Sequence, residues 1–306
     1  MEQVSVRVPA TSANLGPGFD CMGLALGLYS TFTARRAKVA TVNVTGFGVE
    51  SLPTGAGNLV YRSAMSLYEA LGRRVPTLEI HCLNRVPLNR GLGSSANAIV
   101  GGIAAAAALE GMALDDARLL ALAIKLEGHP DNVTPALLGG FQVVVMDGEQ
   151  LVRSSPRVKG GLKAVAFSPA MELATKTARG VLPESLSRAD SVFQSGRTAL
   201  LVAALTQGSW ELLGTATQDR LHQPARTKLM PFMPAVFAAA RKAGAHAAFL
   251  SGAGPTILAL ASGEWERVGT AMQRAAVEEE TPGNYQVLSV ATRGAHIVKS
   301  SQRRLA

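Results

Sequence analysis

The stretch Pro87-Leu-Asn-Arg-Gly-Leu-Gly-Ser-Ser-Ala-Asn97 is a glycine- and serine-rich turn between two apolar segments. Before it, Leu78, Ile80 and Cys82 alternate with polar residues, which is the period of a half-buried strand. After it, residues 98–109 are small and apolar, which predicts a tightly packed helix. The first N–H groups of such a helix have no partner within it, and the helix dipole adds partial positive charge there. We therefore expect an anion such as a phosphate to bind where the loop meets the helix.

The loop also resembles other glycine patterns, which have to be weighed. Gly91 and Gly93 permit unusual backbone angles and close approach of a ligand, and Ser94 and Ser95 supply hydroxyls for phosphate oxygens or Mg²⁺. The P-loop requires Lys-Ser/Thr after its last glycine, and that pair is absent here. Residues 91–96 fit the dinucleotide pattern G-x-G-x-x-A, but the second strand with an acidic end about 20 positions on is missing. An ordinary capped helix after a turn is the remaining alternative.

Four stretches of the chain resemble motifs of the GHMP kinases, which include galactokinase, mevalonate kinase and homoserine kinase. They are the loop above, VPATSANLGPGFDCMGLA (residues 8–25), EGHPDNV (residues 127–133) and SGAGPTI (residues 251–257). The stretch at residues 8–25 is similar to the homoserine kinases in particular. The four motifs stand in the order of the family and are spread over nearly the whole chain. The sequence is therefore identified as a member of the GHMP kinases.

The resemblance implies an α+β fold of two domains. The N-terminal domain would be of the ribosomal-S5 domain-2 type and the C-terminal domain ferredoxin-like, with the active site between them. A chain of 306 residues also exceeds a typical single domain. The sequence turns polar around residues 153–161, so we place the domains at residues 1–155 and 156–306. We predict strands at residues 4–8, 24–34, 39–45, 141–146 (buried), 162–167 and 286–291, and helices after Asn58 and at residues 190–205, 234–242 and 265–277.

The composition limits the class of partner. A hydrophobic content of 47% with 17% charged residues predicts well-formed cores. The net charge of +8 comes from 30 Lys and Arg against 22 Asp and Glu. Because there is no basic stripe interleaved with aromatic residues, a phosphate-carrying substrate explains this excess at least as well as nucleic acid does. We therefore expect small-molecule partners and no nucleic acid.

Cysteines and apolar runs indicate the cellular setting. Cys21 and Cys82 are too few and too far apart for a disulfide framework or a zinc site. The first residues do not resemble a signal peptide, and the longest apolar run, at residues 98–109, falls short of the roughly 20 residues that span a membrane. We therefore expect a cytoplasmic protein without a membrane partner. We also expect a homodimer.

The resemblance also implies which residues contact the two substrates. Those expected at ATP are Asn58, Pro87, Leu88, Asn89, Arg90, Gly91, Leu92, Gly93, Ser94, Ser95, Ala96 and Asn97. Similarity to the homoserine kinases implies that Asn14, Asp20, Asn132, Arg179 and Arg226 bind the amino acid. Asp20 suits a substrate ammonium group, and Arg179 and Arg226 suit its carboxylate through paired hydrogen bonds.

A carboxylate at the end of a predicted helix suggests a metal site. Glu127 is followed by His129-Pro130, which breaks the helix before Asp131-Asn132. Mg²⁺ prefers few protein oxygens together with phosphate oxygens and water, so we expect Glu127 to complete a Mg²⁺ site with a loop serine, Ser94. His129 has no second His or Cys at metal-ligand spacing, and we expect no metal there. Asp131 resembles the catalytic aspartate of mevalonate kinase in position, so Glu127 and Asp131 are the candidate catalytic residues.

Together these motifs imply ATP-dependent phosphorylation of the hydroxyl of L-homoserine to O-phospho-L-homoserine, in threonine biosynthesis. In phosphoryl transfer the protein mostly positions the reactants and neutralises charge, and the residues above supply those functions. Two alternatives stay open. One is another GHMP small-molecule kinase, acting on a mevalonate-pathway or sugar substrate. The other is nucleic-acid binding, which also occurs on the S5-like fold.

Overall fold

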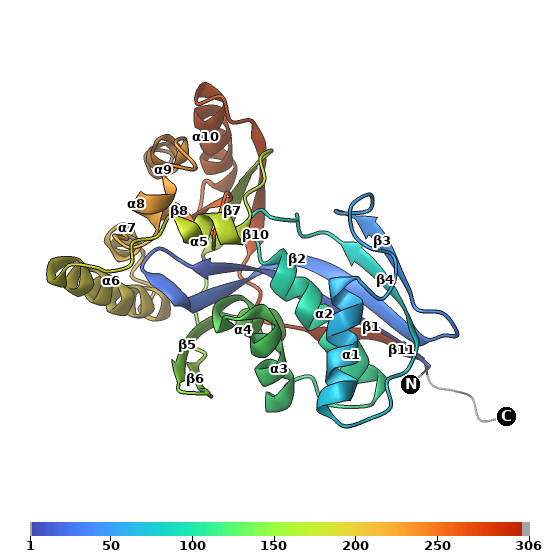
Figure 1. Cartoon of the computed structure of the whole chain (residues 1–306). Coiled ribbons are helices and arrows are strands. Elements are labelled where there is room, and N and C mark those ends of the chain that lie inside the picture. Colours follow the sequence, from blue (N-terminus) through green and yellow to red (C-terminus); the bar gives the residue numbers. More distant parts are fainter. Residues whose placement is uncertain (1, 302–306) are drawn as a thin grey trace.

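Two β-sheets form the framework of the protein, as the computed structural model shows for residues 2–301 (Figure 1). Within that range the first sheet contains seven strands: β1 (Gln3–Asn14), β2 (Gly18–Arg36), β3 (Thr41–Gly46), β4 (Leu78–Asn84), β5 (Phe141–Asp147), β6 (Gln150–Ser154) and β11 (His296–Ser301). Their order is β11-β1-β2-β4-β3, and β5 pairs with both β2 and β6. Neighbouring strands are antiparallel except β3 and β4. The predicted alternation in β4 is confirmed, because Leu78, Ile80 and Cys82 are all buried.

The second sheet has four antiparallel strands within the same described range: β7 (Lys163–Pro169), β8 (Ala247–Leu250), β9 (Ile257–Ala261) and β10 (Gly283–Ser289). Their order is β10-β7-β9-β8. The two-sheet α+β architecture confirms the predicted fold class. The boundary between residues 1–155 and 156–306 stays a prediction. At the end of the chain β11 returns to the first sheet and pairs with β1.

The first sheet is packed against α1 (Leu59–Ala70), α2 (Ser94–Leu109), α3 (Ala117–Glu127) and α4 (Pro130–Leu138). In the middle of this layer, α2 contacts α1, α3, α4 and the two longest strands. The alanines at residues 104–108 are fully buried, and such small side chains let the helix lie close to all these neighbours. Asn58 caps α1 as predicted, because its side chain accepts the Val60 N–H at 2.9 Å.

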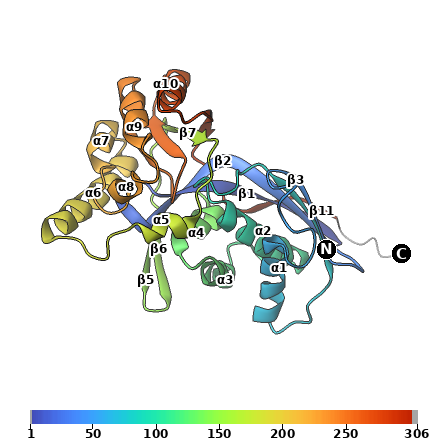
Figure 2. The same cartoon turned by 45° about the horizontal axis from the view of Figure 1, so that its top comes forward.

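The second half contains α5 (Thr175–Gly180), α6 (Arg188–Gln207), the 3₁₀ helix Trp210–Leu212, α7 (Leu213–Ala216), α8 (Gln223–Arg226), α9 (Met233–Lys242) and α10 (Trp265–Glu278). Figure 2 shows α9 and α10 side by side on the second sheet, and Phe167 and Met272 belong to their shared core. Another core joins the two halves, since Leu205 of α6 and Phe249 of β8 belong to the same cluster as Leu24 of β2. None of the helices within residues 2–301 combines the length and apolarity needed to cross a bilayer.

The predicted helices in the second half are confirmed to within two residues at each end as α6, α9 and α10. The helix after the glycine loop differs, because α2 begins at Ser94 and not at residue 98. Both loop serines therefore lie in its first turn. The strand predicted at residues 24–34 is the middle of the longer β2, which needs a partner along its whole length and finds β1 there.

Two strand predictions are wrong in part. β5 was expected to be buried, but Val145 and Met146 are exposed because this end of β5 extends into a hairpin with β6. The strand at residues 286–291 was expected to be the last one. Instead β10 ends at Ser289, and β11 follows, because β1 offers an edge with which it can pair.

Candidate active site

The glycine loop lies between β4 and α2, and its last glycine immediately precedes α2. Gly93 has φ 69° and ψ 34°, and no described side chain caps the helix after it. A Cβ atom here would lie 2.0 Å from Oγ1 of Thr11, so the backbone angle and the space both require glycine. The first turn of α2 therefore presents N–H groups without helical partners beside Ser94 and Ser95, which line a cavity. This is a favourable place for an anion.

Segments from both halves of the chain hold the loop in this shape. In β1 the Thr11 N–H donates to the Leu92 carbonyl at 3.1 Å. From the second half, Oγ of Ser251 donates to the Gly91 carbonyl at 2.6 Å. The Thr11 hydroxyl in turn donates to Oδ1 of Asn132 at 2.7 Å. The loop conformation is thus determined by residues that are far away in the sequence.

A carboxylate stands beside the first turn of α2. Glu127 is the last residue of α3, and its Oε2 accepts a hydrogen bond from Oγ of Ser95 at 2.7 Å. Burial raises the pKa of Glu127, and the nearby Asp131 acts in the same direction, while the Ser95 hydrogen bond and His129 oppose the shift. A carboxylate and a hydroxyl therefore lie together next to the anion site.

The first turn of α4 contributes a second carboxylate. The side chain of Asp131 is only 3% exposed, and its Oδ1 lies 2.6 Å from Nδ1 of His129. Burial lowers the pKa of His129, but the hydrogen bond with Asp131 and the charges of Asp131 and Glu127 outweigh it, so this pKa is raised overall. His129 and Asp131 thus form a hydrogen-bonded pair at the start of α4.

The turn between β1 and β2 adds an ion pair with the second half of the molecule. Asn14 accepts the Asp20 N–H through Oδ1 at 3.0 Å and donates to the Gly252 carbonyl at 3.0 Å. Both carboxylate oxygens of Asp20 receive hydrogen bonds from Arg179 in α5, at 2.7 and 3.0 Å. The hydrogen bonds of Asn14 with Gly252 and of Asp20 with Arg179 therefore connect the two halves of the chain.

Arg226, the last residue of α8, is a buried cation. It is 1% exposed, and its guanidinium donates to the carbonyls of Ala178 at 3.0 Å and Gly252 at 2.9 Å, and to Nδ1 of His222 at 3.1 Å. No carboxylate within residues 2–301 forms an ion pair with it. Burial, with a further contribution from Arg179, lowers the pKa of Arg226 to about 10. An anionic ligand would compensate this charge.

These groups border a single cavity. Its walls include Asn14, Asp20, Gly93, Ser95, Glu127, Asp131, Asn132, Arg179 and Arg226. A second, mostly apolar cavity of about 290 Å³ is lined by Val44, Leu52, Leu59, Val86 and Leu88, among others. The two cavities share Asn89, Ser94 and Ser95, so they meet at the N-terminus of α2. A ligand with a charged part and an apolar part can thus bind with these parts on the two sides of the α2 N-terminus.

Comparison with known proteins agrees with this geometry. The family model "GHMP kinases N terminal domain" matches residues 58–140, and "GHMP kinases C terminal" matches residues 201–287. A homoserine kinase of Moorella thermoacetica is 42% identical over 293 residues, which cover 96% of this chain and 99% of that protein. The chain belongs to the homoserine kinases of the GHMP kinase family.

Other homoserine kinases are similarly close. One from Nostoc punctiforme is 45% identical over 296 residues, which cover 95% of this chain and 97% of that protein. The crystal structure of homoserine kinase from Cytophaga hutchinsonii has a TM-score of 0.88 and 32% identity, and the match covers 97% of this chain and 98% of that one. The resemblance found in the sequence motifs is thereby confirmed over the whole chain.

The residues predicted to bind the amino acid in this GHMP kinase all border the charged cavity. They are Asn14, Asp20, Asn132, Arg179 and Arg226. We expected Asp20 and Arg179 to contact different groups of the substrate, and in the structure they pair with each other. Their individual roles in binding stay predictions.

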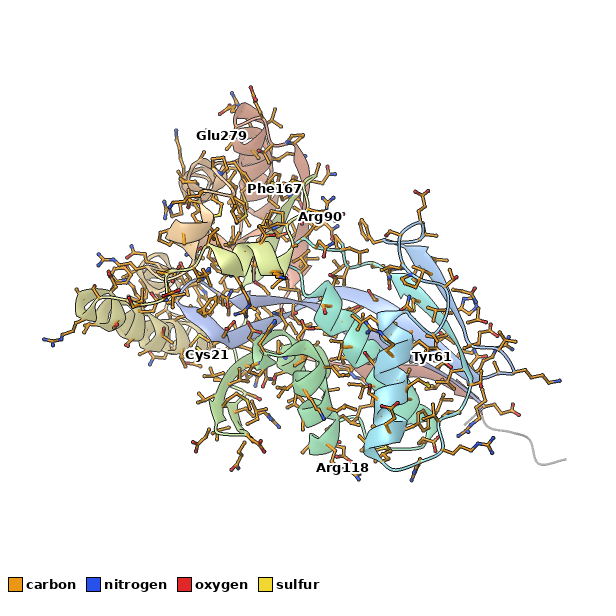
Figure 3. All side chains as sticks on the ribbon, viewed as in Figure 1. Cys21, Tyr61, Arg90, Arg118, Phe167 and Glu279 are labelled. Atoms are coloured by element: carbon orange, nitrogen blue, oxygen red, sulfur yellow. The ribbon has the colours of Figure 1, made fainter. Side chains whose placement is uncertain are left out.

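Most of the residues predicted at ATP border one of the two cavities; Asn89, Ser94 and Ser95 border both, whereas Pro87, Leu92 and Ala96 line neither. Gly91 and Gly93 border the charged cavity, whereas Asn58 and Asn97 border the apolar one. Arg90 behaves differently, because its guanidinium donates to the carbonyls of Pro169 and Ala170 at the end of β7. Figure 3 shows Arg90 between the two halves of the molecule. We infer that Arg90 mainly connects the loop to the second sheet.

The hydroxyl that donates a hydrogen bond to Glu127 belongs to Ser95. Ser94, which we expect to share a metal with Glu127, lines the same cavity, and its role as a metal ligand stays a prediction. Because α2 starts earlier than predicted, both serines are helical, so their side chains point in directions about 100° apart.

Three polar residues at the site were not singled out from the sequence. Thr11 and Ser251 lie within stretches that resemble family motifs, so their place in those stretches was an available signal. For His222 no local signal existed. It is fully buried and bridges Arg226 to the Gly16 carbonyl, and burial lowers its pKa to about 4, although Asp219 opposes the shift.

Gly93→Ala is expected to weaken ATP binding by about tenfold or more, because the added Cβ displaces Thr11 and distorts the N–H groups that would hold phosphate, each worth about 1.5–3 kcal/mol. Calorimetric titration with ATP measures this. Gly111→Ala is the matched control, since Gly111 has φ +72° but open space around its Cβ position. Equal ATP affinity of Gly93→Ala and wild type would remove the loop from the nucleotide site.

Proposed function

We propose that this chain transfers the γ-phosphoryl group of ATP to the hydroxyl of L-homoserine, forming O-phospho-L-homoserine and ADP in threonine biosynthesis. The observation that carries the proposal is the charged cavity. In it the first N–H groups of α2 face Glu127 and Asp131 of the first half and a buried Arg226 of the second, which forms no ion pair with a carboxylate within residues 2–301. An anion site beside two carboxylates and a buried cation suits a phosphate group and a charged amino acid.

ATP would lie across the N-terminus of α2. The triphosphate would accept hydrogen bonds from the N–H groups of the first turn, where the helix dipole favours negative charge. The neighbouring apolar cavity of about 290 Å³ offers Val44, Leu59 and Leu88 to a planar base. Because the two cavities meet at Ser94 and Ser95, a nucleotide can occupy the apolar one and extend its phosphates into the charged one.

Homoserine would occupy the charged cavity with its ammonium and carboxylate groups apart. Asp20 and Arg179 now neutralise each other, at 2.7 and 3.0 Å between their oxygens and nitrogens. A ligand with both charges can replace this pair, with its ammonium at Asp20 and its carboxylate between Arg179 and Arg226. The exchange preserves the charge balance of the site, so binding leaves neither side chain unpaired.

The residues present fit a Mg²⁺ ion. Glu127 and Ser95 provide a carboxylate and a hydroxyl side by side, and no cluster of three or more His, Cys, Asp or Glu within residues 2–301 forms an all-protein metal cage. Mg²⁺ is typically held by one or two carboxylates together with phosphate oxygens and water. When bound, the ion would neutralise charge on the phosphate oxygens.

Asn132 would bind the reacting hydroxyl group, and Asp131 would accept its proton. The Thr11 hydroxyl donates to Oδ1 of Asn132, and the amide nitrogen of Asn132 donates one long hydrogen bond, of 3.4 Å, to Oδ1 of Asp131, so its second N–H would bind the substrate oxygen. During transfer the substrate oxygen bonds to the γ-phosphorus as the bond to the ADP oxygen breaks, and the hydroxyl proton passes to the carboxylate of Asp131. His129, with Nδ1 2.6 Å from that carboxylate, holds it in place.

A substrate panel tests the proposal. ADP release would be measured by a coupled assay with L-homoserine, mevalonate, galactose and L-serine in the presence of Mg²⁺. We expect L-homoserine to give the highest kcat/KM. Mevalonate and galactose lack the ammonium group, and L-serine has the same three groups as L-homoserine but a side chain that is one methylene shorter. Preferred turnover of mevalonate or galactose would contradict the substrate and leave the kinase fold intact. The cytoplasmic location and the homodimer remain predictions from the sequence.

A further inference from the structure

A large cavity lies near the C-terminal end of α4, whereas Asp131 and Asn132 lie at its N-terminal end. Its volume of about 960 Å³ is near the upper end of the range of about 300–1,000 Å³ for small-molecule sites. Residues 153–163 connect the two sheets and form much of its wall. No described residue lines both this cavity and the candidate active site. We propose that this cavity, called the junction cavity, binds an organic anion that carries a flat apolar ring system.

The described charged side chains that line the junction cavity are all positively charged. The cavity is lined by Arg153, Arg157, Lys159 and Lys163, and by no Asp or Glu within residues 2–301. None of these four cations forms an ion pair with a described carboxylate. Cations that line a concave surface without counter-charges raise the local concentration of anions. The charge therefore selects an anionic ligand.

The floor of the cavity is apolar. Phe141 is 1% and Leu162 8% exposed, and both lie in the lining. Trp265 also lines the cavity, and Nζ of Lys163 lies over its ring, 3.9 Å from the centroid. A flat ring can contact the edge of the indole while its anionic group meets Lys163. A bare inorganic anion would leave this apolar surface uncovered, so an organic anion fits better.

The wall of the cavity is already ordered. Ser155 donates to the side chain of Gln142 at 2.8 Å, and the buried Gln142 donates to the Gly139 carbonyl at 2.7 Å. Further along, the Lys159 N–H donates to the Leu205 carbonyl at 2.9 Å. The connecting segment is thus attached to both halves of the protein. A ligand would enter a formed site, which reduces the entropy lost on binding.

Two fluorescent probes with the same kind of ring system test the proposal on the full chain. The probe 8-anilinonaphthalene-1-sulfonate carries one negative charge, and N-phenyl-1-naphthylamine carries none. With a non-hydrolysable ATP analogue, Mg²⁺ and L-homoserine at saturation, we expect one site for the sulfonate, with an affinity at least about tenfold above that of the neutral probe. Displacement of the sulfonate by these ligands, or equal affinity for both probes, would overturn the proposal.

Variants locate the site. Arg157→Glu/Lys163→Glu is expected to weaken sulfonate binding by about tenfold or more, whereas Lys38→Glu/Lys125→Glu, on exposed positions elsewhere, leaves it unchanged. Gly160→Trp is a second test, because Gly160 lines the cavity and its Cβ position has nothing within 4 Å, so the new ring has room to occupy part of the cavity. Thermal unfolding confirms that each variant folds.

Two results would overturn the assignment of the junction cavity. One is unchanged sulfonate affinity in both cavity variants. The other is a self-association of the wild-type chain, seen by analytical ultracentrifugation, that excludes the sulfonate and is lost in Gly160→Trp. That second result would mean that another copy of the chain covers the cavity.

Discussion

Arg226→Met is expected to lower kcat/KM for L-homoserine by about 100-fold or more, with little change in the affinity for ATP. The guanidinium is 1% exposed, and its hydrogen bonds go to two backbone carbonyls and a neutral histidine, so the substrate carboxylate would be its first anionic partner. Losing one member of a desolvated charge pair costs about 2–5 kcal/mol, and about 1.4 kcal/mol corresponds to tenfold. Steady-state kinetics with separate titrations of the two substrates measures the effect.

The controls separate binding from folding. Arg241→Met removes an exposed arginine from α9, in the same half of the molecule, and should behave as wild type. Arg226→Lys keeps a charge but loses the planar donor geometry, so an intermediate loss is expected. Thermal unfolding shows whether Arg226→Met remains folded. A folded Arg226→Met protein with wild-type KM for L-homoserine would show that this cation does not bind the substrate.

Glu127→Gln is expected to lower kcat by about 100-fold and to raise the Mg²⁺ concentration required for half-maximal activity. The side chain keeps its size and can still accept from Ser95, but it loses the charge that would hold the ion. Removing a group that stabilises charge in the transition state commonly costs about 2.7–4 kcal/mol. Glu279→Gln, at an exposed position labelled in Figure 3, is the matched control. If activity and the Mg²⁺ titration of Glu127→Gln match wild type, Glu127 is only the end of a helix.

The pH dependence of stability, with and without Mg²⁺, follows from Glu127. Burial raises the pKa of Glu127 in the folded chain, so without a metal its contribution to stability is present below the ordinary glutamate pKa. That contribution is lost as the pH rises through the raised pKa. Mg²⁺ needs the ionised form, so the stabilisation by Mg²⁺ with ATP should decrease as the pH falls through the raised pKa of Glu127. Thermal unfolding across pH measures this decrease, which should be smaller in Glu127→Gln.

Much of the site could be predicted because its motifs are local. Gly93 precedes the first turn of α2, and a helix N-terminus attracts anions wherever the helix lies. Asn58 caps α1 through a bond to a residue only two positions away. Glu127 ends α3 because Gly128, in the left-handed conformation, follows it. Each of these features depends on a few neighbouring residues, so the sequence around them is sufficient.

The partners of these residues could not be predicted, because they come from distant parts of the chain. Asp20 and Arg179 are 159 positions apart. The sequence around each residue predicts a side chain that binds substrate directly, and it gives no sign that the two side chains pair with each other. The choice of Ser95 over Ser94 beside Glu127 depends on how α2 and α3 pack. Nothing in the sequence around Arg226 indicates that its side chain is buried. It is a buried cation because α5, the rest of α8 and the Gly252 carbonyl surround its guanidinium.

The same distinction holds for the fold. The sequence by itself predicted the positions of α6, α9 and α10 to within two residues at each end, because helix propensity depends on residues that are close in the sequence. It also determined, through the order of its motifs, membership of the GHMP kinases. Only the tertiary structure decided that β11 pairs with β1, nearly 300 residues away, and that residues 153–163 enclose the junction cavity. The physical reason is that strand pairing and cavity shape depend on contacts between distant segments, for which no local pattern of residues is specific.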